Sequence, residues 1–378
     1  MTGSALSEKR FGVQFRLLRA CGIPLFMKNP SIFFKLYSYL VVVCMTSLSI
    51  TVLIGTVTNS DTLKRFMQNA RIFFGIFGVT VAFMFNRFFL DKVEYLINLT
   101  EQFTWEDLPK TESFRMTSWI PRVQTAGKYT FIVIFIFHYV QSAVRVLTLE
   151  ELVFDIWFPF DTSKSPTFEI IVFFQFIASL TVVAIFAGYL PLNCALMAVA
   201  CSQLEKLAVD LIELKQDHDF MLQLQNWIRC HQQALGYVKA MEDSLSMYMG
   251  VQFIPLFLGP CIFAFSAITS WGDFTDQTQA FVAFTAFIGQ ACVLCWFGAQ
   301  LTEAAENVKR AAWGCDWIGT PIPVQKTILF IIARGNTDVT ITAGKFVPLS
   351  NVTLMHMINN CLSMFMFLLN VKDRKEIA

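Results

Sequence analysis

Charged side chains are scarce in this sequence. Only 15% of its 378 residues are Asp, Glu, Lys or Arg, against about a quarter in an average soluble domain, and the net charge is +1. The near balance of charge gives no indication of the basic surface with which proteins hold nucleic acid. The shortage of charge excludes an ordinary soluble domain. Hydrophobic residues make up 55% of the chain, including 40 Phe, which indicates a polytopic membrane protein.

Groups that carry chemistry are also missing. The chain has four His residues and no paired carboxylates, metal-ligand cluster or nucleophile beside a base, so we expect no enzyme activity, cofactor or metal site. The first thirty residues lack an apolar core followed by a small-residue cleavage site, so no removable signal peptide is expected. None of the ten cysteines falls in a predicted outer loop, and we therefore expect no structural disulfide.

Apolar runs predict an all-α protein with seven transmembrane helices. Each run can cross the roughly 30 Å hydrocarbon core of a bilayer at about 1.5 Å per residue. We place the spans at residues 32–57, 69–90, 128–149, from 167 onward, 248–269, 279–299 and 345–371. Residues 91–125 are predicted to form a polar loop. The acidic and aromatic segment 150–166 is expected to fold back over the mouth of the bundle.

Basic residues predict the orientation. They concentrate in the N-terminal segment, in the loop after helix two and at the joints after helices four and six, which places these segments in the cytosol. The basic tail, which contains Lys372, Arg374 and Lys375, is the one feature that opposes this orientation. The predicted order is a cytosolic segment 1–31, helices one to four in 32–200, cytosolic extensions 201–247, helices five and six in 248–300, a cytosolic anchor segment 301–344, helix seven in 345–371 and an extracellular tail 372–378.

Helices four, five and six continue beyond the membrane. After helix four, Leu204, Leu207 and Leu211 recur at three- and four-residue steps, as on one face of a helix. We expect these extensions and a short helix at 327–333 to form a cytosolic anchor. The anchor could form within one chain or between subunits. An apolar stripe that stays exposed to water would not stabilise a single protomer, so we favour packing between subunits.

The last predicted helix carries an uncharged polar stripe. Its polar members fall within an arc of roughly 120°. They are Thr353, His356, Asn359, Asn360, Ser363 and Asn370. An unpaired amide or hydroxyl is costly in lipid, so the stripe faces protein or water. Such residues can bind neighbouring helices, but Phe367 and Val371 lie on the same face and would narrow a channel with apolar rings. We interpret the stripe as the lining of a pore.

Several motifs resemble one known family. Gln290, Cys295-Trp-Phe-Gly298, Ala311-Ala-Trp-Gly-Cys-Asp-Trp317, Ile331-Ile-Ala-Arg334 and Thr342-Ala-Gly-Lys-Phe-Val-Pro-Leu-Ser350 occur in this order. Together they resemble the C-terminal signature of insect odorant receptors. Trp157-Phe-Pro-Phe-Asp161, followed by Ser165-Pro166, resembles that family's second outer loop. Two positions depart from the pattern, since Trp313 stands where Tyr is frequent and Val347 where Phe is.

The resemblance implies a ligand-gated, poorly selective cation channel in the plasma membrane of olfactory sensory neuron dendrites. It implies a heterotetramer with a shared co-receptor subunit. The co-receptor has a much longer joint between helices four and five than residues 215–223, so this chain resembles the odour-tuning subunit. Carried onto matching positions, the resemblance implies a gate at Phe367, Asn370 and Val371, and the stripe adds Asn360 and Thr353 to the pore lining.

The resemblance also implies an odorant pocket in the outer half of the bundle, among helices two to six. Depth and residue type then give candidate ligand-binding residues. These are Phe73, Phe74, Phe77, His138, Gln141, Phe173, Ile177, Phe281, Phe284, Thr285 and Ile288. We expect a mostly apolar, aromatic-rich pocket for a small, volatile, aromatic molecule. Because directional bonds would be few, selectivity would come from shape.

Other functions fit the sequence less well. A G-protein-coupled receptor needs an extracellular N-terminus, against the bias of basic residues, and no Asp-Arg-Tyr-like motif follows helix three. A secondary transporter would carry an ionisable residue near the membrane midplane and an internal repeat. Here the acidic and basic residues cluster at the ends of the predicted helices, and no internal repeat is apparent. A gustatory-type receptor channel is the nearest alternative, and the C-terminal signature separates the two.

Overall fold

The chain is almost entirely helical. The computed structural model describes residues 5–27, 29–58, 62–102, 116–148, 151–154, 156–162, 164–214 and 220–377. Seven of its helices are long and apolar enough to cross a membrane. They are α2 (Ile32–Thr58), α3 (Leu63–Phe88), α5 (Trp119–Thr148), α6 (Thr167–Glu213), α7 (Phe220–Thr269), α8 (Phe274–Gly314) and α10 (Asn351–Ile377). The predicted all-α class with seven membrane helices is confirmed.

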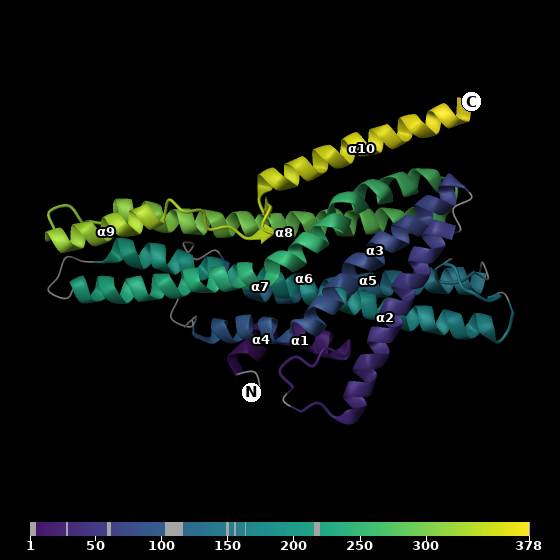
Figure 1. The fold of residues 1–378 in the computed structure, drawn as a ribbon, viewed down its shortest axis with the longest axis horizontal. Helices are drawn as coiled ribbons and strands as arrows, with labels where there is room; N and C mark the ends of the chain where they lie inside the picture. The colour runs from purple at the N-terminus through teal and green to yellow at the C-terminus, as the bar shows by residue number, and fades with distance from the viewer. Residues whose placement is uncertain are drawn as a thin grey trace.

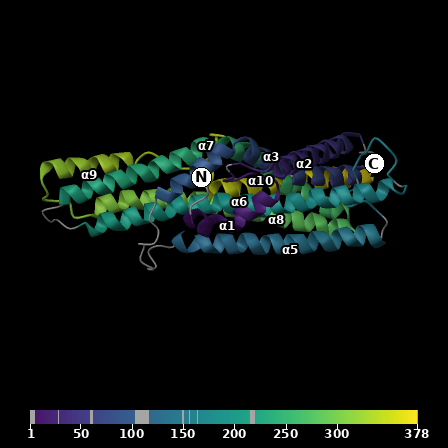
Figure 2. The same ribbon diagram turned by 90° about the horizontal axis from the view of Figure 1, so that it is seen from below.

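Three helices far exceed the length of a membrane span. α6, α7 and α8 contain 47, 50 and 41 residues, whereas about 20 suffice to cross a bilayer. Their extensions gather with α9 (Ile322–Arg334) at one end of the molecule (Figures 1 and 2). The predicted short helix 327–333 lies within α9.

The apolar stripes of these extensions are covered within one chain. Leu211, Leu224 and Ile328 are fully buried there. The indole nitrogen of Trp227 in α7 donates a hydrogen bond of 2.8 Å to the carbonyl of Leu207 in α6. Our expectation that other subunits cover these stripes is therefore wrong, because α6 and α7 bury them against each other and against α8 and α9.

Two membrane helices begin earlier than predicted. α3 begins at Leu63 rather than at residue 69, because the side chain of Thr62 accepts a hydrogen bond from the backbone N–H of Arg65 and caps the helix. α5 begins at Trp119 rather than at residue 128. Pro121 is tolerated there because the first turn of a helix has no hydrogen bond for its missing N–H to lose.

The predicted polar loop 91–125 contains regular structure. α4 (Leu90–Leu99) buries Val93, Leu96 and Ile97, which recur at helical spacing. Two short 3-10 turns follow, η1 (Thr100–Gln102) and η2 (Met116–Ser118). An amphipathic helix in a charged segment was not recognised because only its buried face is apolar.

The N-terminal helix α1 (Ala5–Ala20) packs into the bundle against α6. Phe11, Phe15 and Leu18 are buried completely or nearly so. A Cβ atom on Gly188 of α6 would lie 3.1 Å from a methyl group of Leu18, so α6 approaches α1 closely at this glycine. The N-terminal segment is therefore part of the packed structure.

The segment between α5 and α6 folds back over the helices, as expected. Val153 and Ile156 are buried. The side chain of Gln175 in α6 accepts a hydrogen bond from the N–H of Phe154 at 3.0 Å and donates one to its carbonyl at 2.9 Å. Residues 149, 150, 155 and 163 of this connection lie outside the described residues.

A small hairpin lies between α9 and α10. β1 (Thr342–Ala343) pairs antiparallel with β2 (Val347–Pro348), and the turn places Gly344 and Lys345 at φ values of +66° and +63°. The predicted start of helix seven at residue 345 is therefore wrong. α10 begins at Asn351, beyond the hairpin, because a left-handed turn cannot continue an α-helix.

The hairpin is held firmly on α7. The N–H of Gly344 donates to the carbonyl of Ser246 at 2.7 Å, and the N–H of Lys345 donates to the Ser246 hydroxyl at 2.9 Å. A Cβ atom on Gly250 would lie 2.7 Å from the Cα atom of Gly344, so only glycine permits this approach. From this joint α10 runs at an angle to the other helices (Figure 1).

Candidate functional site

One face of α10 packs against α7 and α8, and the opposite face is open. Leu354, Ile358 and Phe365 are partly buried on the packed face. The exposed face carries most of the predicted polar stripe: His356, Asn359, Asn360, Ser363 and Asn370. The amides and hydroxyls of the stripe therefore point away from the rest of the chain.

Thr353 departs from the stripe. Its side chain is 9% exposed, and its hydroxyl donates to the carbonyl of Pro348 at 2.7 Å. It also lies 3.1 Å from the hydroxyl of Ser350, whose side chain accepts a hydrogen bond from the N–H of Thr353. The predicted pore-lining role of Thr353 does not fit this geometry, because its side chain fastens the first turn of α10 to the hairpin.

Phe367 lies on the open face, near the end of the stripe, and is 64% exposed. It follows the exposed Ser363 by one helical turn and precedes the exposed Asn370 by another. Apolar and amide groups thus share this end of the open face. The side chain of Val371, predicted to complete the gate, lies outside the described residues.

A second apolar cluster lies beneath the folded-back segment, separate from the main core that runs through α6, α7 and α8. We call it the loop-side apolar cluster. Its buried members are Leu48, Val52, Ile72, Ile76, Ile156 and Ala178, and Phe73, Phe154, Phe158 and Phe174 pack against them. Phe73 also stacks on Phe77, with ring centroids 5.4 Å apart and planes at 24°. Apolar and aromatic surface from α2, α3, α6 and the folded-back segment meets here.

His138 of α5 borders this cluster. Its ring stacks on that of Phe154, with centroids 6.1 Å apart. The Nε2 atom of His138 shares a hydrogen bond of 2.6 Å with the hydroxyl of Ser179, which also lies 2.8 Å from the carbonyl of Phe176. The Oε1 atom of Gln141, one turn away, is buried with no partner among the described residues. His138 and Gln141 are thus polar groups at the edge of an apolar cluster.

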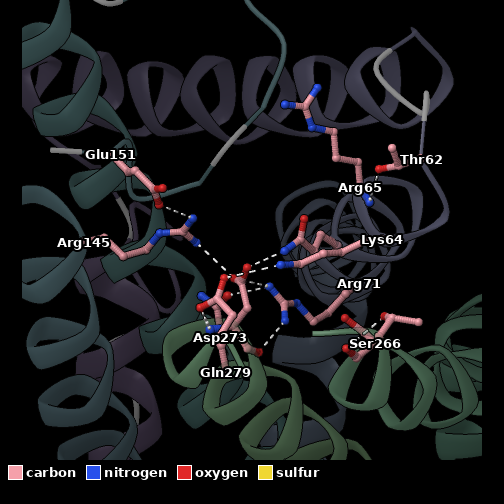
Figure 3. Close-up of polar contacts among 12 residues, drawn as sticks. Thr62, Lys64, Arg65, Arg71, Arg145, Glu151, Ser266, Asp273 and Gln279 are labelled. Atoms are coloured by element: carbon pink, nitrogen blue, oxygen red, sulfur yellow. Dashed lines mark hydrogen bonds and ion pairs between the residues drawn. The ribbon is translucent and has the colours of Figure 1, made fainter. Parts of the chain in front are cut away.

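A charged cluster lies next to the loop-side apolar cluster, since its residue Arg71 directly precedes Ile72 in α3. Asp276, near the start of α8, contacts Arg71 of α3 at 3.1 Å and Arg145 of α5 at 3.4 Å. All three side chains are at least nine-tenths buried. Arg145 also binds Glu151 of the folded-back segment at 3.0 Å. Arg71 and Arg145 approach from opposite sides (Figure 3), so these charges tie three helices and one loop together.

Further polar contacts complete the charged cluster. Arg71 donates to the carbonyl of Asp276 at 2.7 Å and to the side chain of Gln279 at 2.8 Å, and the amide of Gln68 also binds the Asp276 carboxylate. Asp276 therefore accepts hydrogen bonds from two arginines and one amide. Such saturation is what a carboxylate requires when it is removed from water.

The chain matches the family model described as 7tm Odorant receptor over residues 62–362, which is most of its length. The chain belongs to the odorant receptor family. The resemblance drawn from its C-terminal motifs is thereby confirmed, and the receptor is a multi-pass plasma-membrane protein of sensory neurons rather than an enzyme.

Three proteins of Drosophila melanogaster show how far the sequence likeness extends. Putative odorant receptor 92a is 24% identical over 152 residues, which cover 40% of this chain and 37% of the relative. Odorant receptor 19a is 22% identical over 149 residues, 39% and 38% of the two chains. Odorant receptor 2a is 29% identical over 100 residues, 26% and 25%. The chain thus matches less than two fifths of the length of each relative.

Solved structures extend the likeness to the whole fold. The olfactory receptor OR5 from Machilis hrabei, solved in complex with eugenol, matches with a TM-score of 0.82 and 21% identity, over 96% of this chain and 98% of that one. The same receptor without eugenol matches with a TM-score of 0.79, over 97% and 98%. At this identity the likeness establishes the receptor's fold.

Four predicted ligand-binding residues of the receptor lie on its outer surface. They are Phe173, Ile177 and Phe281, exposed by 69, 42 and 64%, and Thr285, which is also exposed. In α6 the neighbouring residues Phe174 and Ala178 face the loop-side apolar cluster instead. α6 is apolar around its whole circumference, so its sequence does not mark the inward face. Phe173 and Ile177 therefore lie on the outward face of α6.

The remaining predicted residues divide between two regions. Phe73, His138 and Gln141 lie at or beside the loop-side apolar cluster. Phe77 joins it through its stack on Phe73. Phe74 contacts Phe73 edge-on, with ring centroids 5.4 Å apart, and also packs against the main core. Phe284 packs against the main core, and Ile288 is partly buried.

Sequence reasoning missed the charged cluster. Arg71 was not singled out in the sequence, but it lies two turns inside α3 and is 3% exposed. Arg145 and Asp276 are 131 residues apart in the chain. Arg71 and Arg145 fall within the predicted spans 69–90 and 128–149, which could have marked them, whereas Asp276 precedes the span predicted at 279 and carries no such signal. In the described part of the receptor, no group of three or more His, Cys, Asp or Glu residues is placed to hold a metal ion.

Proposed function

We propose that the receptor is the odour-tuning subunit of an odorant-gated, non-selective cation channel, assembled as a heterotetramer with a co-receptor subunit. The observation that carries this proposal is the open polar face of α10. A membrane helix that turns amides and hydroxyls away from its own chain needs water or another protein on that side. Four such helices arranged around a central axis would place each polar face beside a water-filled pore and beside neighbouring subunits.

The proposed topology has a cytosolic N-terminal segment, a cytosolic anchor and an extracellular C-terminal tail. The distribution of basic residues supports it. The folded-back segment and the charged cluster then lie at the extracellular mouth, and the ends of α6, α7 and α8 lie with α9 in the cytosol. The short joint at 215–223 supports the tuning role rather than the co-receptor role, and residues 215–219 of it lie outside the described residues.

The anchor offers a surface for partner subunits. On α9 the side chains of Ile322, Leu329 and Phe330 are 67, 49 and 76% exposed, whereas Ile328 is fully buried. Exposed apolar side chains grouped on a helix outside the membrane are typical of a protein interface. We place the contact with the co-receptor here, on α9 rather than on the stripes of α6 and α7.

The proposed odorant site is the loop-side apolar cluster with His138 and Gln141 at its edge. Its aromatic and aliphatic side chains suit a small, volatile, apolar molecule, and the two polar groups offer one or two hydrogen bonds. A ligand that binds better when α10 moves outward would shift the receptor toward the open state. Phe367, Asn360 and Asn370, together with Val371, would line or gate the pore.

Replacing Phe174 with alanine is expected to raise the odorant concentration for half-maximal current by tenfold or more. The substitution removes most of a partly buried aromatic side chain from the proposed site, and an odorant packed on this ring would bury the rest of it; complete burial of a Phe contributes about 1.5–3 kcal/mol. The matched control is Phe173→Ala, which alters the adjacent but outward-facing residue. Equal effects of the two variants in a dose–response series would move the odorant site away from this cluster.

Replacing Phe367 with serine is expected to increase the current measured without odorant. An apolar ring closes a narrow pore by excluding water, and a hydroxyl group admits water. Leu362→Ser is the control, because Leu362 is 57% exposed but lies about 140° round α10 from Phe367, on the side away from the polar stripe. The measurement is basal current relative to surface abundance. An unchanged basal current in Phe367→Ser would place the gate elsewhere.

The proposed function is tested by expressing the receptor alone and with a co-receptor while G-protein signalling is blocked. Fast cation current in response to small aromatic volatiles, present only in the co-expressing cells, is the expected result. Odorant responses that disappear with the block would instead identify a G-protein-coupled chemoreceptor and overturn both the topology and the pore.

A further inference from the structure

A groove runs along the outside of the receptor, between α2, α3, α7 and the hairpin, and Phe73 and Phe77 at the border of the loop-side apolar cluster form part of its wall. Its volume is about 1180 Å³. Phenylalanine and aliphatic side chains form most of its walls. Ile50, Phe88, Met247 and Phe346 line it and are 56, 74, 78 and 90% exposed. The groove is therefore open to its surroundings along its length, unlike an enclosed pocket for a small molecule.

One end of this groove is basic. Lys92 of α4 and Lys345 of the hairpin turn line it, together with Asp243 of α7. Lys345 lies 3.6 Å from Asp243, but both side chains are more than half exposed, so water screens this pair. The ammonium group of Lys92 lies 5.0 Å from the ring centroid of Phe89. Among the lining residues of this end, two side chains are positively charged and one is negatively charged. The neighbouring carboxylate of Glu242 is already engaged by the N–H and hydroxyl of Thr342.

The basic end lies where helices leave the membrane. α3 ends at Phe88 and α4 begins at Leu90. Around this corner Phe88, Phe89 and Tyr95 are 74, 43 and 54% exposed. Exposed aromatic rings beside lysine are typical of the boundary between hydrocarbon and lipid headgroups. The apolar walls of the groove therefore lie at the depth of acyl chains and the lysines at the depth of headgroups.

We propose that this groove binds an anionic phospholipid of the cytosolic leaflet. Its acyl chains would lie along α3 and α7, and its phosphate between Lys92 and Lys345. The proposal rests on the topology given under the proposed function, which places the basic end in the cytosol, where anionic lipids are concentrated. Apolar walls alone would accept any acyl chain, but the two lysines match the charge of an anionic headgroup.

The bound lipid would touch the joint that carries the pore helix. Lys345 lies in the hairpin turn, and the hairpin leads directly into α10. The carboxylate of Glu242 binds the N–H of Thr342 at 2.8 Å and also its hydroxyl, so the hairpin and α7 form one wall of the groove. A headgroup on Lys345 therefore stabilises this joint, and anionic lipid is expected to alter how readily odorant opens the pore.

Native mass spectrometry of the purified full-length receptor, offered phosphatidylserine and phosphatidylcholine together, tests the site. Wild type is expected to retain phosphatidylserine in preference to phosphatidylcholine. The double variant Lys92→Gln/Lys345→Gln is expected to bind it about 25-fold more weakly, since each lysine near a membrane surface accounts for about fivefold. Lys164→Gln is the control, because Lys164 is 82% exposed and precedes α6 at the opposite end of the membrane helices.

Two results would overturn the lipid site. One is equal retention of the two lipids, or retention that Lys92→Gln/Lys345→Gln leaves unchanged. The other is crosslinking of a photoreactive residue at Met247 to a neighbouring subunit, which would make the groove a protein interface, whereas crosslinking to phosphatidylserine supports the proposal. Retention is measured without odorant, so it is independent of the channel activity. Loss of odorant current in every lipid mixture would count against the proposed function alone.

Discussion

Replacing Asp276 with asparagine is expected to destabilise the receptor by about 3–5 kcal/mol, the usual cost of removing one partner from a buried ion pair. Asp276 is the buried carboxylate between Arg71 and Arg145. Without its charge, two buried guanidinium groups repel each other, and only the half-exposed Glu151 remains beside Arg145. The measurements are surface abundance in cells and the thermal unfolding midpoint of purified receptor, and both should fall sharply.

Asp273→Asn is the matched control. Asp273 lies one turn before Asp276 and pairs with Lys64 at 3.7 Å, but both side chains are more than one-third exposed, so at most about 1 kcal/mol is expected. Its side chain also caps α8 by accepting from the N–H of Asp276, a role that asparagine keeps. Adding Arg145→Gln to Asp276→Asn removes one unpaired charge and should restore part of the stability. Equal effects of Asp276→Asn and Asp273→Asn would contradict the buried network.

Replacing Gly298 with alanine is expected to destabilise the receptor by about 3 kcal/mol, at the upper end of the cost of overpacking. A Cβ atom at this position of α8 would lie 2.3 Å from the carbonyl oxygen of Leu349 and 2.6 Å from its Cβ atom. Leu349 stands two residues before α10 begins. The backbone of this joint would have to move, so we also expect weaker odorant-evoked current per receptor at the cell surface.

Gly289→Ala, in the same helix, is expected to change the stability of the receptor in the opposite direction. No heavy atom lies within 4 Å of the Cβ position at Gly289. Alanine is therefore expected to stabilise α8 by about 0.5–1 kcal/mol, because glycine loses more conformational freedom in a helix. Thermal unfolding of both variants separates the two effects. A Gly298→Ala receptor as stable as the Gly289→Ala receptor would show that α8 and the start of α10 do not touch as described.

Features with a strong local signal were predictable from the sequence. The seven spans follow from long apolar runs, and the open face of α10 follows from polar residues confined to one side of an otherwise apolar helix. Gly298 and Leu349 fall in two separate motifs of the C-terminal signature, and their close approach gives a physical reason for that part of the resemblance.

Features that depend on tertiary structure were not predictable. α6 is apolar on all sides, so only its packing shows that Phe174, and not Phe173, faces inward. Arg71 and Asp276 are 205 residues apart in the chain, and no local pattern pairs them. The early starts of α3 and α5 were missed because their first turns are too polar to continue an apolar run.

The central claim, that the open face of α10 lines the pore, is tested most directly by cysteine accessibility. In a Cys361→Ser background, cysteine is placed at Ser363 and Asn370 on the open face, and at Leu354 and Ile358 on the packed face. A membrane-impermeant thiol reagent should reduce odorant-evoked current at the first two positions and leave the other two unchanged. Modification only at the packed-face positions, or no modification at Ser363 and Asn370 in the open state, would contradict the pore.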